Sequence, residues 1–216
     1  FAANAAGDDI EFRDPTGSLL MIWRNLRQQQ MRPDGKPNQC LADFVAPVDD
    51  WAGAFAVTAG IGIEKKLAEF EAAHDDYHAI MLKALADRLA EAAAEWLHER
   101  VRKDYWGYAG DEELTKEQLV AEKYQGIRPA PGYPACPDHT VKGELFRLLE
   151  APGHADMGLT ESYAMTPAAS VAGFYLAHPE ARYFAIQKIG EDQLLDWADR
   201  NSMSVEQARR WLAPLL

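Results

Sequence analysis

Residues 64–103 contain neither proline nor glycine, which makes forty consecutive residues without a helix breaker. Alanine, leucine, glutamate and lysine dominate this stretch, and all four favour helix. The composition predicts one long helix or two helices in sequence, around which the other elements must pack. The large apolar residues recur at helical spacing, at Met81, Leu85, Leu89 and Trp96, and they share one arc with the alanines between them. We expect this stripe to face the core.

The segments before this block are typical of short strands. The sequence DDIEFRDPTGSLLMIW predicts two strands joined by a turn at residues 14–17, where proline and glycine suit a turn. Two further strands are predicted in CLADFVAP and WAGAFAVTAG, because alanine, valine and phenylalanine are dense enough there for burial on both faces.

The segments after the block mix helix and hairpin patterns. Helices are predicted in LTKEQLVAEKY and TVKGELFRLLE, with Thr115 and Thr140 as N-caps. SVAGFYLAHPEARYFAIQKI has two apolar runs around residues 178–181 and predicts a β-hairpin. Two helices close the chain, and Ser204 with Gln207 predicts a capping box for the second. This order of elements indicates a single α+β domain rather than alternating βαβ units.

Charge and composition exclude several classes of partner. The formal net charge of −12 argues against a nucleic-acid partner, because phosphate binding needs clustered lysine and arginine. No apolar run is long enough to cross a bilayer, so we expect no membrane association. The two cysteines, Cys40 and Cys136, are too few for a disulfide framework and fit a reducing cytoplasm, although one bridge stays open. Because the chain begins with Phe1 and not methionine, we expect a piece of something longer.

The sequence RPAPGYPACPDH, residues 128–139, contains four prolines. Each proline fixes its own φ angle and restricts the residue before it, so the loop has little conformational entropy to lose on binding. Arg128 suits a carboxylate or a phosphate, Gly132 allows a ligand close to the main chain, and Tyr133 offers a flat face with a hydroxyl. Two interpretations stay open: a rigid binding loop, or a connector between two helices.

With its flanks, this loop reads YQGIRPAPGYPACPDHT and resembles the S-adenosylmethionine-binding segment of the activation domain of cobalamin-dependent methionine synthase. The resemblance continues, in the family's order, through CLADFVAP, GAFAVTAG, FEAAHDDYHAIMLKALADRLAEAAAEWLHERVRKDYWGYA, LTESYAMTPAASVAGFYLAHPEARYFAIQKI and MSVEQARRWLAP. It implies a C-shaped α+β domain in which helices flank a bent antiparallel sheet. The family domain is longer at its N-terminus, so residues 1–216 resemble its C-terminal two-thirds.

The resemblance implies a function in methionine biosynthesis. In the family, cobalamin occasionally oxidises to inactive cob(II)alamin, and the activation domain brings S-adenosylmethionine to it while flavodoxin or a flavoprotein reductase supplies an electron. Reductive methylation then restores methylcobalamin. The implied enzyme is 5-methyltetrahydrofolate–homocysteine methyltransferase, whose other domains carry cobalamin and zinc. We expect this chain to hold no nucleophile or general base and to be inactive alone, because the cofactor and the methyl donor supply the reacting groups of the methylation.

The family's ligand contacts map onto seven positions of this sequence. Arg128 matches the arginine that the family uses on the ligand carboxylate, and Glu122 matches a nearby acidic position. The positions implied to lie against S-adenosylmethionine are Arg128, Ala130, Gly132, Tyr133, Tyr183, Phe184 and Glu122. The family often has tyrosine where Phe184 stands, so a hydroxyl is missing here.

An acidic face is predicted on the long helical block. Lys83, Asp87 and Glu91 are spaced four residues apart, with Glu95 and His98 close to the same line. Spacing alone fits a solvated helix face with ordinary ion pairs. The resemblance implies instead that Asp87 and Glu91 contact the cobalamin-binding domain, near a histidine that their carboxylates would stabilise as imidazolium.

An alternative function and several further candidate sites are less well supported by the sequence. A docking module that contacts the cobalamin domain and flavodoxin without binding a ligand stays open as an alternative function. His74 and His78 stand one helical turn apart, as zinc ligands do, but no third ligand is evident. CPDH places Cys136 near two further candidate side chains, yet a small loop residue is the simpler interpretation. The basic run at residues 98–103 fits either an acidic partner such as flavodoxin or a solvated helix end.

Overall fold

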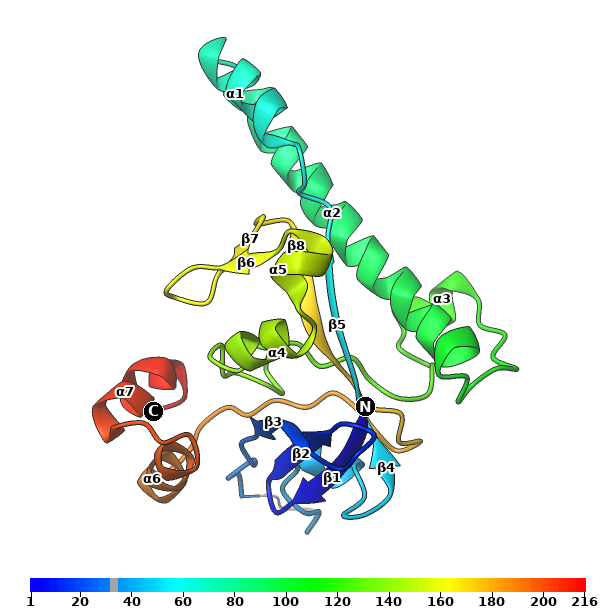
Figure 1. The fold of residues 1–216 in the computed structure, drawn as a ribbon, viewed down its shortest axis with the longest axis vertical. Helices are drawn as coiled ribbons and strands as arrows, with labels where there is room; N and C mark the ends of the chain where they lie inside the picture. The colour runs from blue at the N-terminus through cyan, green and yellow to red at the C-terminus, as the bar shows by residue number, and fades with distance from the viewer. Residues whose placement is uncertain (32–34) are drawn as a thin grey trace.

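A four-stranded antiparallel sheet lies at one end of the molecule, with strand order β3-β2-β1-β4 (Figure 1). The computed structural model describes residues 1–31 and 35–216. The hairpin predicted over residues 8–23 is confirmed: β2 and β3 pair around a turn in which Asp14 Oδ1 accepts from the Thr16 and Ser18 amides. The strands of the sheet are β1 (Ala2–Ala6), β2 (Asp9–Arg13), β3 (Leu19–Arg24) and β4 (Asp50–Trp51).

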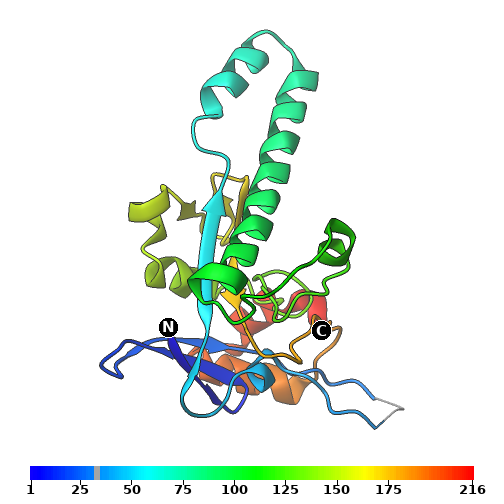
Figure 2. The same cartoon turned by 90° about the vertical axis from the view of Figure 1, so that its right-hand side faces the viewer.

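A two-stranded antiparallel ribbon rises from this sheet and connects it to the helices (Figures 1 and 2). It pairs β5 (Gly53–Thr58) with β8 (Ser170–Tyr175), which confirms the predicted strand in WAGAFAVTAG. Phe174 of β8 stacks on Trp23 of the sheet at 3.9 Å between ring centroids, and both are fully buried. The ribbon and the sheet therefore share one core. A second small ribbon joins β6 (Gly158–Leu159) to β7 (Met165–Thr166).

The proline-free block forms two helices, as predicted. They are α1 (Glu64–Ala72) and α2 (Asp76–Arg100), and they project from the molecule as a helical hairpin (Figure 2). Asp75 caps α2 by accepting from the His78 amide at 3.2 Å. A π-helical turn, η2 (Val101–Tyr105), continues α2.

The core face predicted for α2 is wrong for its large residues and right for Ala86, Ala90 and Ala94 among the alanines between them. Met81, Leu85, Leu89 and Trp96 are 40–62% exposed, whereas the alanines of the opposite side are buried. The buried positions are Ala79, Ala86, Ala90, Ala94 and His98. Ala94 packs against Phe55 and Tyr175 of the ribbon. Small side chains let the helix axis approach a strand pair closely, and this close approach decides which face is covered.

The shorter helices agree with the sequence in place, but one cap differs. Thr115 is the predicted N-cap and also forms a capping box with Gln118, and Ser204 forms the predicted capping box with Gln207. Thr140 is not an N-cap: it donates its amide and hydroxyl to Asp138 instead. Asp138 thus organises the start of the helix that follows. The helices are α3 (Lys116–Val120), α4 (Lys142–Leu148), α5 (Ala151–Ala155), α6 (Glu191–Arg200) and α7 (Val205–Trp211), with 3₁₀ turns η1 (Leu41–Phe44) and η3 (Ala213–Leu215).

One strand prediction is wrong and another is only half right. CLADFVAP forms η1 rather than a strand, because the Asp43 carboxylate accepts from the Cys40 amide at 2.9 Å and closes a turn. The hairpin over residues 170–189 is half right: its first part is β8, but residues 181–189 run extended without a strand partner.

The α+β class and the antiparallel pairing are confirmed, with the strands divided among the three sheets described above. Throughout the part of the chain that the structure describes, no helix has both the length and the apolar character needed to cross a bilayer.

Candidate functional site

The proline-rich loop lies along the free edge of β8. Ile127 and Leu176 exchange two backbone hydrogen bonds of 2.9 and 3.0 Å, and the Phe174 amide donates to the Pro129 oxygen at 3.0 Å. The loop thereby takes the edge that a hairpin partner would need. This is the physical reason that residues 181–189 do not pair with β8. They cross the loop instead, where the Ile186 amide donates to the Pro134 oxygen at 2.8 Å.

The turn at Gly132 sets the shape of the loop. Its φ is +95°, and its amide donates to the Cys136 oxygen at 2.7 Å, while the Cys136 amide donates to the Tyr133 oxygen at 2.9 Å. A Cβ at residue 132 would lie 2.3 Å from Cε1 of His139. Only glycine fits this position, and the tight turn fixes where the neighbouring Tyr133 ring stands.

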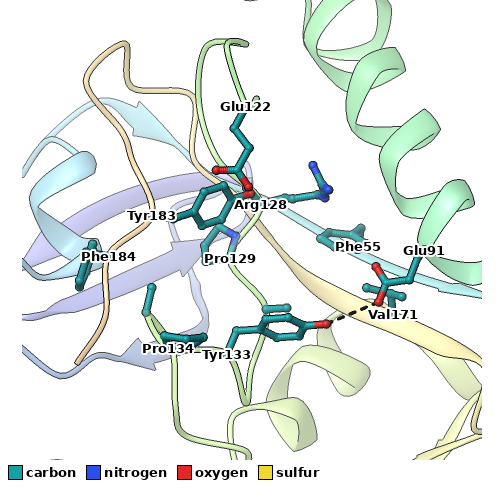
Figure 3. A pocket seen from close by; sticks show the side chains of 12 residues that line it. Phe55, Glu91, Glu122, Arg128, Pro129, Tyr133, Pro134, Val171, Tyr183 and Phe184 are labelled. Carbon is teal, nitrogen blue, oxygen red and sulfur yellow. Dashed lines mark hydrogen bonds between the residues drawn. The ribbon is translucent and has the colours of Figure 1, made fainter. Parts of the chain in front are cut away.

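A cavity of about 290 Å³ opens between the loop, α2 and the extended segment 181–189 (Figure 3). This volume is near the lower end for small-molecule sites. Six of the seven predicted contact residues line it; Gly132 does not and forms the adjacent turn. The lining residues are Phe55, Glu91, Glu122, Arg128, Pro129, Ala130, Tyr133, Pro134, Ala135, Val171, Tyr183 and Phe184.

Arg128 is held by groups from α2 and by two tyrosines. Its Nη1 donates to Tyr124 Oη at 3.0 Å and to His98 Nδ1 at 3.3 Å, and its Nη2 forms an ion pair with Glu95. The Arg128 main-chain amide donates to Tyr183 Oη at 3.0 Å. The segment that carries Tyr183 is thus tied to the start of the loop, although it is not the strand that the sequence predicts.

His98 is a buried neutral imidazole under the site. Burial, together with the positive charges of Arg102 and Arg128, lowers the pKa of His98 to about 2. Because an arginine only donates, Nδ1 of His98 accepts from Arg128, which leaves the proton on Nε2, 3.4 Å from Tyr108 Oη. His98 is therefore an uncharged acceptor at physiological pH.

Arg102 corrects the prediction of a solvated basic helix end. Its side chain is fully buried and pairs with Glu112, with Nη2 to Oε1 at 2.7 Å and Nε to Oε2 at 3.0 Å. Its guanidinium lies 4.4 Å above the centroid of the Tyr124 ring. Arg102 thus fixes the tyrosine that accepts from Arg128, and it offers no charge to a partner protein.

Carboxylates outnumber cations around the cavity. Glu91 accepts from Tyr133 Oη at 3.5 Å (Figure 3), so the structure places this residue at the loop as well as on the acidic face of α2. Glu122 lines the same cavity. Asp87, one turn before Glu91, does not line it and is exposed. A site with this charge favours a ligand that carries a positive centre.

Sequence reasoning missed the apolar wall of the cavity. Phe55 comes from β5 and Val171 from the start of β8, where nothing in the local pattern distinguishes a wall residue from a core residue. Phe184 was predicted, and it is half-buried: it also packs against Phe44, with 6.5 Å between ring centroids.

The remaining candidates from the sequence are the two cysteines and the pair of His74 and His78. Cys40 and Cys136 are buried free thiols, and burial raises the pKa of both. His78 Nδ1 lies 2.6 Å from Oδ2 of Asp75, its own helix cap. Among residues 1–31 and 35–216, no group of three or more histidine, cysteine, aspartate or glutamate side chains is arranged to hold a metal ion.

Two comparisons match this architecture. Residues 1–202 match the family described as "Vitamin B12 dependent methionine synthase, activation domain". The structure is also similar to a solved one, the "Crystal Structure of the MetH Reactivation Domain bound to AdoHcy", with a TM-score of 0.95 and 56% sequence identity. That match covers 100% of this chain and 68% of the other.

Proposed function

Because this chain belongs to the activation-domain family of vitamin B12-dependent methionine synthases, we propose that it binds S-adenosylmethionine in the cavity beside the proline-rich loop. The proposal is supported chiefly by one coincidence. Six residues that sequence resemblance assigns to the ligand line a single cavity, and a 56% identical domain is described as bound to AdoHcy.

The chemistry of the cavity fits an amino-acid sulfonium. Arg128 supplies N–H donors for the ligand carboxylate. Tyr133 and Tyr183 present aromatic rings, and Glu91 and Glu122 supply negative charge, both of which stabilise a cationic sulfur. Because Ala130 and Gly132 carry little or no side chain, the ligand can approach the main chain of the loop.

In this proposal the chain positions the methyl group, and it contributes no nucleophile or general base. Cobalamin, bound to another domain of the enzyme, supplies the reactive metal, and zinc also belongs to other domains. Methyl transfer needs the sulfonium methyl aligned with its acceptor, so a loop with few accessible conformations is the main contribution of these residues. The chain is part of a methyltransferase, and we expect no turnover by the chain alone.

We also propose the two protein contacts that reactivation requires. Asp87 is exposed on α2, one turn from Glu91 at the cavity edge, so both carboxylates can face a docked cobalamin-binding domain beside the ligand. The electron donor in this proposal is flavodoxin or a flavoprotein reductase. Replacing Asp87 and Glu91 by asparagine and glutamine in the intact enzyme should slow reactivation and change the cobalamin spectrum, and an unchanged rate with an unchanged spectrum removes this contact.

Isothermal titration with S-adenosylmethionine tests the binding proposal. We expect saturable binding by the wild-type chain and a loss of at least about tenfold in affinity for Arg128→Ala, because hydrogen bonds to a charged group are worth about 1.5–3 kcal/mol. Arg147→Ala is a matched control, since Arg147 lies on α4 and does not line the cavity. A well-folded wild type that gives no heat with the ligand supports a docking module instead.

A further inference from the structure

We propose that Glu95 is a positioning residue for Arg128: its carboxylate holds the guanidinium so that the remaining N–H donors face the ligand. This inference rests on the proposed function, because it concerns how the same cavity binds an amino-acid carboxylate. Glu95 itself is not among the residues that line the cavity, and it acts through Arg128.

The Arg128 guanidinium donates three hydrogen bonds within the protein. Tyr124 and His98 accept from Nη1, and Glu95 accepts from Nη2. Among the described residues, the structure gives Nε no acceptor. A guanidinium has five N–H donors. The three protein acceptors leave two donors, which is the number that a carboxylate takes in a bidentate pair.

The two neutral acceptors, His98 and Tyr124, are held in place by their surroundings. His98 is fully buried and stacks on Tyr175 with 5.1 Å between ring centroids. Tyr124 is 7% exposed and lies under the Arg102 guanidinium, which Glu112 holds in turn. These acceptors are fixed by packing, so they define where Nη1 must lie.

Glu95 is the charged member of the set. Its side chain is 39% exposed and that of Arg128 is 20% exposed, so neither is locked by burial. Without the carboxylate, the guanidinium can rotate about its last side-chain bonds, and the ligand must order it on binding. Ordering one flexible side chain costs about 0.5–1.5 kcal/mol, equivalent to roughly threefold to tenfold in affinity.

Titration of Glu95→Gln with two ligands tests the inference. S-adenosylhomocysteine has the amino-acid carboxylate, whereas 5′-methylthioadenosine lacks the amino-acid group. We expect the variant to bind S-adenosylhomocysteine about threefold to tenfold more weakly than wild type, with unchanged affinity for 5′-methylthioadenosine. In an Arg128→Ala background, Glu95→Gln should have no further effect. Glu99→Gln is the matched control, one turn further along α2 and paired with Arg100.

NMR of the arginine side chains gives a readout that needs no ligand. Hindered rotation in wild type should give Arg128 separate Nη1 and Nη2 signals, which merge in Glu95→Gln. Equal or tighter binding of S-adenosylhomocysteine by the variant, equal losses for both ligands, or an unchanged Arg128 spectrum overturns the inference. These outcomes differ from failure of the proposed function, in which the wild type binds neither ligand and both proposals fall.

Discussion

The main-chain oxygen of Pro129 lies where a side chain at residue 173 would begin: a Cβ on Gly173 would be 2.5 Å from that oxygen and 3.2 Å from Cα of Ala130. Gly173 stands in the middle of β8, where a glycine normally weakens a strand. Here it lets the loop lie flat against the ribbon. The place of the loop over β8 therefore depends on a residue far outside the proline-rich segment.

Replacing Gly173 by alanine should displace the loop. Overpacking of this kind costs about 1–3 kcal/mol of stability, and the shift should also weaken ligand binding because Arg128 and Ala130 move with Pro129. Urea denaturation and calorimetric titration measure the two effects. Gly153→Ala is the control, because a Cβ there meets nothing within 4 Å. Equal stability of the two variants would contradict the close approach.

His98 should make stability depend on pH in a defined direction. Its pKa is lowered from 6.5 to about 2 in the folded chain, so the unfolded chain binds the extra proton between these values. The contribution is complete above pH 6.5 and falls as the pH drops below it. Between pH 7.5 and 5.5 the wild type should lose about 1.4 kcal/mol that His98→Asn does not lose.

Denaturant titrations at both pH values measure this difference. His74→Asn is the control, since His74 is exposed and has a positive φ that asparagine tolerates. If His98→Asn and wild type lose the same stability over this range, the imidazole is not held neutral by its surroundings.

Removing one partner of the buried Arg102–Glu112 pair should destabilise the fold strongly, whereas replacing both partners by apolar side chains should destabilise it little. Arg102 is fully buried. Glu112→Gln therefore leaves a buried guanidinium without its counter-charge and should lower the stability of the fold by about 3–5 kcal/mol. Arg102→Met with Glu112→Leu should recover most of that loss, because two apolar side chains need no partner. Thermal unfolding of the three proteins gives the comparison, and a double variant no more stable than Glu112→Gln argues against it.

Substitutions on the two faces of α2 should change stability to different extents. Leu89 is 62% exposed, so Leu89→Gln should change stability by less than about 0.5 kcal/mol. Ala90 is 1% exposed, so Ala90→Leu should destabilise by about 1–3 kcal/mol through overpacking. Thermal unfolding followed by circular dichroism measures the stability of both variants. A large loss of stability for Leu89→Gln would show that the leucine face of α2 is buried, as the sequence predicts.

Most local signals are predicted correctly from the sequence because they act within a few residues; the cap at Thr140 and the turn that replaces a strand at residues 40–44 are the exceptions. Thr115 and Ser204 cap their helices through contacts three residues away, and Asp14 closes its turn through neighbouring amides. The forty-residue block without proline or glycine forms helices for the same reason. The proline-rich loop was also recognisable as stiff, since each proline acts on its own backbone.

Competition between distant segments decided the partner of β8 and the buried face of α2. The sequence by itself determined where most helices and turns form and which loop is rigid, because propensities and caps are properties of neighbouring residues. Only the tertiary structure decided that the loop, and not residues 181–189, occupies the edge of β8, and that alanines rather than leucines of α2 are buried. One strand edge accepts one partner, and the closest approach of two backbones selects the smallest side chains. The ion pair between Arg128 and Glu95 follows from that packing, because it joins residues that are 33 positions apart in the chain.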